Sequence, residues 1–137
     1  MNIYITKDDS KKIENFTNIK LQTFQKEVNE IINNSCENIV VDDIIDFVSH
    51  ESIPILISAL VQKLRTGGKI FITGIELGVL CRHTVSEIVS EQDYSSVISP
   101  RASLSCVDSI VNLLKDKKLN IETSTIKGLR YEITATR

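Results

Sequence analysis

Glycine is scarce in this 137-residue chain, and none occurs before Gly67. A loop that cradles a phosphate or nucleotide uses glycine wherever the backbone must approach the ligand closely. The first candidate strand, MNIYIT, is instead followed by the polar stretch TKDDSKKI. Neither a P-loop pattern nor a GxGxxG pattern occurs anywhere in the chain. The sequence therefore lacks the glycine loop expected after the first strand of a nucleotide-binding α/β fold.

Cysteine is also sparse, and its pattern argues against disulfide bonds and metal sites. The three cysteines are Cys36, Cys81 and Cys106, and no two of them form a CxxC pair. An odd number of cysteines in apolar or helical contexts predicts reduced, partly buried thiols in a cytoplasmic compartment. Cys81 and His83 together supply at most two metal ligands, so we expect no metal site.

Long apolar runs and an excess of positive charge are absent as well. No apolar run reaches the length of about 18 residues that spans a bilayer, and the chain does not begin with a basic-then-apolar leader. We therefore expect a soluble cytoplasmic protein that does not enter membranes. The net charge of −2 makes general binding to nucleic acid unfavourable. Basic residues do gather towards the C-terminus, and binding through them would predict a salt-sensitive affinity. These residues are Lys115, Lys117, Lys118, Lys127, Arg130 and Arg137.

The hydrophobic pattern predicts alternating strands and helices. Strands are expected over 1–6, 16–22, 39–41, 69–77, 119–126 and 129–136, and helices over 23–34, 49–66, 78–91 and 103–118, with a short helix or turn over 91–99. We expect Ser49 or Ser52 to cap the second helix and Gly67 or Gly68 to end it. Ser105 and Asp108 have the spacing of a capping box for the last helix.

The order of these elements predicts one α/β domain over residues 1–137. The run Ile39–Val41 is continuously β-branched, as in a strand buried on both faces of a parallel sheet. A helix joined to the next strand by a Gly-Gly turn is half of a βαβ crossover, which implies parallel strands. The last two strands flank Lys127-Gly128 and form a predicted antiparallel hairpin.

Two stretches carry a resemblance to a known family. The segment NSCENIVVDDIIDFVSHES, followed by LVQKLRTGGKIFITGIEL, resembles the C-terminal half of class I S-adenosylmethionine-dependent methyltransferases, in particular small ones from phages and glycan gene clusters. The closing segment ASLSCVDSIVNLLKDKKLNIETSTIKGLRYEITATR is similar to the last helix and hairpin of that family. The resemblance implies a Rossmann-like, mostly parallel sheet with a C-terminal antiparallel hairpin, shortened in its N-terminal half.

The same resemblance implies that the cofactor site has been altered. Thr6, Lys7 and Asp8 stand where the family has its glycine loop. Lys20 stands where the family has an acidic residue that accepts hydrogen bonds from the ribose, and lysine is only a donor. We therefore expect no bound cofactor and treat these four residues as vestigial cofactor positions. S-adenosylmethionine is the cofactor expected if the site works in a variant form.

Asp42, Asp43 and Asp46 follow the third predicted strand, where open α/β sheets place ligands. They are interpreted mainly as acids that complement the dipole of the next helix. Asp43 and Asp46 remain the best candidates for a general base, with Asp46 in the place of the family's glutamate. His50 lies near the family's methyl-transfer cleft, but a capping or surface role suits it better.

The predicted function is that of a methyltransferase-like protein without catalysis, a binding or structural module. The missing first crossover helix is expected to leave apolar sheet area uncovered, which favours a homo-oligomer or a partner protein such as an active methyltransferase. A phage-encoded protein would work in the cytoplasm of its host. The alternative is an active methyltransferase on a sugar or another small metabolite, because positioning alone can drive methyl transfer.

Overall fold

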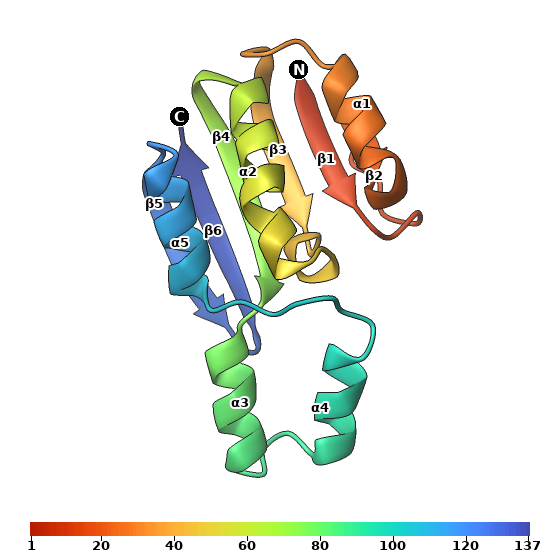
Figure 1. Cartoon of the computed structure of the whole chain (residues 1–137), viewed down its shortest axis with the longest axis vertical. Coiled ribbons are helices and arrows are strands. Elements are labelled where there is room, and N and C mark those ends of the chain that lie inside the picture. Colours follow the sequence, from red (N-terminus) through yellow and green to blue (C-terminus); the bar gives the residue numbers. More distant parts are fainter.

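The computed structural model describes all 137 residues and contains one six-stranded sheet (Figure 1). The strand order is β2-β1-β3-β4-β6-β5. The first four strands pair in parallel, β6 is antiparallel to β4, and β5 is antiparallel to β6. The strands are β1 (Asn2–Thr6), β2 (Thr17–Lys20), β3 (Cys36–Asp42), β4 (Leu64–Ile75), β5 (Asn120–Lys127) and β6 (Arg130–Thr136). This mostly parallel sheet with an antiparallel C-terminal pair is the predicted one.

Five α-helices connect the strands, and most lie where the sequence predicts them. They are α1 (Phe24–Glu30), α2 (Ile53–Lys63), α3 (Leu77–Val85), α4 (Glu91–Ile98) and α5 (Val107–Asp116). Three short 3-10 helices cover Leu21–Thr23, Ile45–Phe47 and His50–Ser52. The segment 91–99 is thus mainly helix, and none of the helices has the length and apolar character needed to span a bilayer.

The helices α1, α2 and α5 pack on one face of the sheet, which we call the helical face (Figure 1). Side chains alternate between the two faces of a strand. Those on the helical face form one core cluster with Val28 of α1, Leu60 of α2 and Leu114 of α5. The sheet contributes aliphatic residues to this cluster, among them Ile3, Ile5, Ile39, Val41, Ile70, Ile72 and Ile133. The core is therefore a single layer between sheet and helices.

The opposite face of the sheet, which we call the open face, is mainly polar. The pairing register places on it Asn2, Tyr4 and Thr6 of β1, Asn38, Val40 and Asp42 of β3, Lys69, Phe71 and Thr73 of β4, and Glu132, Thr134 and Thr136 of β6. Val40 is half-buried, so β3 is not buried on both faces as its β-branched run predicts. The open face also keeps one short apolar row, because the register places Tyr4, Val40 and Phe71 side by side across β1, β3 and β4.

The helix ends differ from the sequence prediction in several places. Helix α2 ends at Lys63, and Leu64 is already extended, so Gly67 and Gly68 lie inside β4 rather than at the end of a helix. Gly67 has a φ of 76°, and a Cβ on Gly68 would lie 2.9 Å from the carbonyl oxygens of Arg65 and Cys36. The glycines therefore permit an irregular pairing of β4 with β3. Similarly, α1 ends at Glu30 and α3 at Val85, earlier than predicted.

The predicted caps are also absent. Neither Ser49 nor Ser52 caps the backbone of α2, and their hydroxyl groups lie 2.8 Å from each other. The N-cap of α5 is Cys106, and the hydroxyl of Ser105 is buried without a hydrogen-bond partner. Ser105 and Asp108 therefore do not form the expected capping box.

Glu76 caps two helices at once. Its Oε2 accepts a hydrogen bond from the backbone N–H of Val79 in α3 at 2.7 Å, and its Oε1 accepts one from Val107 in α5 at 3.1 Å. The side chain is buried between the two helix starts, at 4% exposure. Helices α3 and α4 project beyond the end of the sheet (Figure 1). Glu76 thus ties the base of this projection to the body of the molecule.

Candidate functional site

The candidate site lies at the carboxyl ends of β1, β3 and β4, the edge at which open parallel sheets bind ligands. The strand register places Thr6, Asp42 and Thr73 side by side, so that they form a polar row across this edge. A pocket of about 310 Å³ opens here. It is lined by Thr6, Lys7, Asp8, Lys11, Asp42, Asp43, Phe47 and Arg101. Phe47 is the only hydrophobic residue among them.

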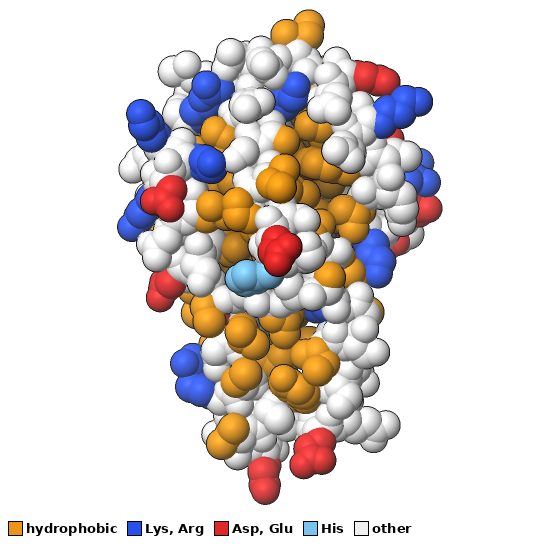
Figure 2. Space-filling view, viewed as in Figure 1, with side chains coloured by type: hydrophobic (Ala, Val, Ile, Leu, Met, Phe, Trp, Pro, Cys, Tyr) orange, Lys and Arg blue, Asp and Glu red, His pale blue; other side chains and the backbone are white.

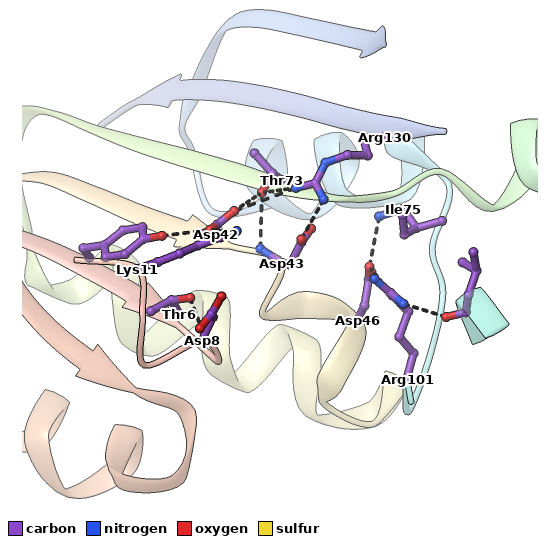
Figure 3. A network of polar contacts seen from close by, with 12 residues as sticks. Thr6, Asp8, Lys11, Asp42, Asp43, Asp46, Thr73, Ile75, Arg101 and Arg130 are labelled. Atoms are coloured by element: carbon purple, nitrogen blue, oxygen red, sulfur yellow. Dashed lines mark hydrogen bonds and ion pairs between the residues drawn. The ribbon is translucent and has the colours of Figure 1, made fainter. Parts of the chain in front are cut away.

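Asp42 is the centre of the polar contacts in this pocket (Figure 3). It accepts hydrogen bonds from the hydroxyl of Tyr4 at 2.8 Å, from the ammonium of Lys11 at 3.2 Å and from the hydroxyl of Thr73 at 3.2 Å. Burial opposes ionisation of Asp42, but the hydrogen bonds from Tyr4 and Lys11 outweigh it and lower its pKa. Burial, together with the hydrogen bond to Asp42, raises the pKa of Tyr4 to about 12. Asp42 is thus an ionised, fully engaged carboxylate.

Asp43 is held by the C-terminal hairpin. The guanidinium of Arg130 donates to its Oδ2 at 2.7 Å and lies 3.8 Å from Asp42 (Figure 3). The backbone of Asp43 has a φ of 58°, and its N–H donates to the hydroxyl of Thr73 at 3.2 Å. Burial opposes the charge on Arg130, but the carboxylates of Asp43 and Asp42 outweigh this and raise its pKa. The interpretation of Asp42 and Asp43 as helix-dipole acids is wrong, because α2 begins only at Ile53 and has no acidic residue in its first turn.

Asp46 faces the protein interior instead of the pocket. Its side chain is fully buried and accepts hydrogen bonds from the N–H of Ile75 at 2.9 Å and from Arg101 at 3.3 Å (Figure 3). Its backbone carbonyl accepts from the N–H groups of Ala102 and Ser103. Burial raises the pKa of Asp46, although the bonds from Ile75 and Arg101 oppose the shift. Through these contacts Asp46 holds the segment between α4 and α5 against the sheet, which is a structural role.

Three of the four vestigial cofactor positions meet in the pocket. Thr6 accepts a hydrogen bond from the backbone N–H of Asp8 at 3.1 Å. The ammonium of Lys7 lies 3.9 Å from the ring centre of Phe47, within cation–π range. Lys20 is at the neighbouring edge, in a second pocket of about 340 Å³ that Thr6 and Asp8 also line. There it forms an exposed ion pair with Asp9 at 3.0 Å.

His50 does not join this site. It belongs to the 3-10 helix before α2 and lines a separate pocket of about 260 Å³ with Ser105 and Asp116. Cys81 and His83 are on α3 and line none of these three pockets. No group of three His, Cys, Asp or Glu side chains in the structure has the arrangement to hold a metal ion.

The sequence did not reveal which lysine and arginine side chains pair with the aspartates of this site. Lys11 comes from the connection between β1 and β2, Arg101 from the segment after α4, and Arg130 from the start of β6. Arg130 is 87 residues from Asp43 in the chain. Pairing the predicted strands at their ends would have brought Arg130 near Thr73 and Asp43, but no local pattern indicates Lys11 or Arg101.

No protein-family model matches this sequence, and no curated protein is detectably similar to it. Solved structures do match. An S-adenosylmethionine-dependent methyltransferase from Archaeoglobus fulgidus superposes with a TM-score of 0.68 at 10% identity, covering 97% of this chain and 74% of that protein. An O-methyltransferase family protein from Burkholderia thailandensis gives 0.63 at 10% identity, covering 89% and 36%.

A methyltransferase from Thermotoga maritima, described as a possible histamine N-methyltransferase, gives a TM-score of 0.60 at 12% identity and covers 88% of this chain. This chain spans 64% of that protein and so is shorter than each of the three. At these identities the likeness concerns the fold and not the activity. The chain has the methyltransferase-like, Rossmann-like fold of class I S-adenosylmethionine-dependent enzymes.

Proposed function

We propose that this protein is a methyltransferase-like binding module or partner subunit whose S-adenosylmethionine site has been dismantled. The observation that carries the proposal is the chemistry of the pocket at the carboxyl edge. Seven of its eight lining residues are polar or charged, and a lysine covers the ring of the eighth, Phe47. Sites for small molecules and cofactors are lined mainly by apolar side chains, with a few polar groups that fix the orientation of the ligand.

The adenine of the cofactor would need a flat apolar slot. Phe47 is the one aromatic group available, and Lys7 lies on its ring while the guanidinium of Arg101 is 5.3 Å from the ring centre. A pocket of about 310 Å³ is also at the lower end of the range for small-molecule sites, about 300–1,000 Å³. The residues present therefore do not fit the adenosyl part of the cofactor.

The ribose and the amino-acid end fit no better. A ribose diol requires an acceptor at the end of β2, and Lys20 is a donor that is already paired with Asp9. Near Thr6, the loop carries a Cβ at every position where glycine would admit a ligand to the backbone. Asp8 and Asp42 add negative charge beside the place of the cofactor's carboxylate. Misfits in three parts of one ligand support a dismantled site more strongly than a single change would.

The carboxylates of Asp42 and Asp43 at this edge are already paired with cations. Lys11 and Tyr4 engage Asp42, and Arg130 engages Asp43. Asp46 is sealed in the interior. The same ion pairs fix the carboxyl edge of the sheet, which suits a rigid module. The three cysteines are free thiols, from which we infer a cytoplasmic location.

Calorimetric titration with S-adenosylmethionine and S-adenosylhomocysteine tests the proposal. We expect no binding heat up to millimolar ligand, whereas the methyltransferase of Archaeoglobus fulgidus serves as the positive control in the same buffer. Micromolar binding would overturn the proposal. It would favour the alternative, an active methyltransferase on a sugar or another small metabolite, in which the variant loop at Thr6–Asp8 holds the cofactor.

A further inference from the structure

The strand β5 forms one outer edge of the sheet, and the backbone groups on its outer side have no partner. It pairs only with β6, and no other segment lies along its outer side (Figure 1). Seven of its eight residues are exposed. No hydrogen bond joins the backbone of residues 121–127 to any part of the chain apart from β6. A free edge of this kind is a template for pairing with another strand.

The hairpin turn determines which backbone groups of β5 point outwards. The two-residue loop 128–129 makes the residues that flank it a hydrogen-bonded pair of the antiparallel ladder. Such pairs alternate along the strands, so that Thr123 and Thr125 direct their backbone groups to β6. The N–H and C=O groups of Ser124 and Ile126 therefore point away from β6, out of the edge of the sheet.

The usual protection of a sheet edge is weak along β5. Proteins protect such edges with short strands, proline, bulges and charged side chains. The strand β5 contains no proline, and its one irregularity lies before Thr123, at its start. Its two charged residues, Glu122 and Lys127, form ion pairs with Lys69 on β4 and Glu132 on β6, so both charges are directed across the sheet and not towards the edge. The opposite edge strand, β2, has only four residues.

The edge of β5 selects its partner more narrowly than the apolar surfaces of the molecule do. Figure 2 shows apolar side chains between α1 and α2 and again between α3 and α4. Apolar contact alone does not distinguish one partner from another. A row of unpaired backbone N–H and C=O groups instead accepts another extended strand. Every copy of this chain carries such a strand in β5 itself.

We propose that two copies of this chain pair antiparallel through β5 and so join their sheets into one continuous sheet. The regular part of β5 begins after the irregularity and covers 123–127, with Thr125 at its midpoint. A two-fold axis through Thr125, perpendicular to the sheet, makes the two regular parts overlap completely. Ser124 of each copy then lies opposite Ile126 of the other, and the backbone groups that point outwards hydrogen-bond to one another.

The side chains fit this register. Thr125 lies opposite its own copy, and threonine pairs across two strands are stabilising. Lys127 lies opposite Thr123 of the other copy, so no two like charges are directly opposite. The contact uses the same surface on both copies and is therefore isologous, so that association stops at two copies.

This inference goes beyond the proposed function, since no part of it depends on the pocket at the carboxyl edge of the sheet. The homo-oligomer predicted from the sequence was to cover exposed sheet area. The unpaired backbone groups of β5 instead place the contact between copies at an outer edge strand, and both faces of the sheet stay as they are in one copy.

Light scattering on the purified chain over a range of concentrations tests the dimer. One pair of short strands buries less area than the standard interface of about 1,600 Å², so we expect a weak dimer. The mass should rise from 15.4 kDa towards twice that value between micromolar and millimolar concentration. Over the same range, hydrogen exchange should slow at the amides of Ser124 and Ile126, which point outwards. The amides of Thr123 and Thr125 bond to β6 and should be protected at every concentration. A chain that stays monomeric at millimolar concentration would overturn the inference.

Ser124→Pro blocks the edge without breaking the hairpin, because the lost N–H points away from β6. The variant should fold and remain monomeric at the concentration at which the wild type is dimeric. Ser124→Ala is the matched control, since it keeps the N–H and should dimerise as the wild type does. A dimer that Ser124→Pro does not weaken would contradict pairing through this edge.

Disulfide cross-linking tests the register, in a Cys81→Ser background that removes the exposed native thiol. The two-fold axis places Thr125 directly opposite its own copy, at the close spacing of a pair without backbone hydrogen bonds, so Thr125→Cys should form a covalent dimer under mild oxidation. Thr123→Cys is the control, because Thr123 lies opposite Lys127 and not opposite its own copy. Equal cross-linking of both variants, or of neither, would refute the proposed pairing. All these substitutions lie outside the pocket at the carboxyl edge, so this result and the calorimetric one can fail separately.

Discussion

Glu76 offers the sharpest prediction, because one buried side chain serves two helices. Glu76→Ala removes the acceptors of the Val79 and Val107 N–H groups, which lie 2.7 and 3.1 Å from the carboxyl oxygens. Removing a capping acceptor costs about 0.5–2 kcal/mol. Two caps therefore give a loss of about 1–4 kcal/mol in the free energy of unfolding. Because the site is only 4% exposed, water cannot easily replace the lost acceptors, which favours the upper part of this range.

Glu76→Gln separates the two caps. Glutamine keeps one oxygen acceptor and presents an NH₂ group to the other N–H, so it should lose at least one cap and destabilise the protein less than alanine does. Urea denaturation measures both changes. Hydrogen exchange at the amides of Val79 and Val107 should accelerate in Glu76→Ala. Glu14→Ala, at an exposed loop position, serves as the control and should be nearly neutral. A loss below about 0.5 kcal/mol for Glu76→Ala, the usual range of a surface substitution, would refute the reasoning.

Two further predictions concern the sheet. A Cβ on Gly74 would lie 2.5 Å from the hydroxyl oxygen and 2.7 Å from Cζ of the buried Tyr131, so Gly74→Ala should cost about 1–3 kcal/mol by urea denaturation. Tyr131→Phe should recover part of that cost, and an equal cost in both backgrounds would contradict the contact. Tyr4 should titrate at about 12 rather than 10.0, so its contribution to stability is complete below pH 10 and is lost as the pH rises through 12. Asp42→Asn should move this pKa part of the way back, as followed by the ultraviolet absorbance of the phenolate, and an unchanged titration would disprove the coupling.

The order of elements could be predicted from the sequence because it depends on local patterns. Alternation in MNIYIT, the apolar spacing in α2 and the Lys127-Gly128 turn each determine their element within a few residues. The end of α2 could not be predicted in this way, because extended pairing of Leu64 with Cys36 competes with another helical turn. The intrinsic helix propensity of each residue carries no information about that tertiary contact.

The candidate site was predictable in position but not in chemistry. Asp42 and Asp43 follow a predicted strand of the parallel sheet, so their place at its carboxyl edge follows from general rules. Their partners Lys11 and Arg130 come from distant segments, and which of the basic residues would reach them depends on the register of β4 with β6. The interior position of Asp46 likewise depends on contacts with Ile75 and Arg101 that no local spacing encodes.

The one-sided burial of the sheet has a consequence for how this protein can evolve. Along β3 and β4, every second residue lies half-buried on the open face and, away from the polar network at the carboxyl edge, is less restrained than its neighbours in the core. We expect a saturation mutagenesis of Asn38, Phe71 and Thr134 to tolerate far more exchanges than one of Ile39, Ile70 and Ile133. A sheet covered on both faces keeps twice as many restrained positions per strand. A chain with half as many restrained positions would lose detectable sequence similarity to its relatives sooner. This agrees with a fold that matches many solved structures and a sequence that matches no family model.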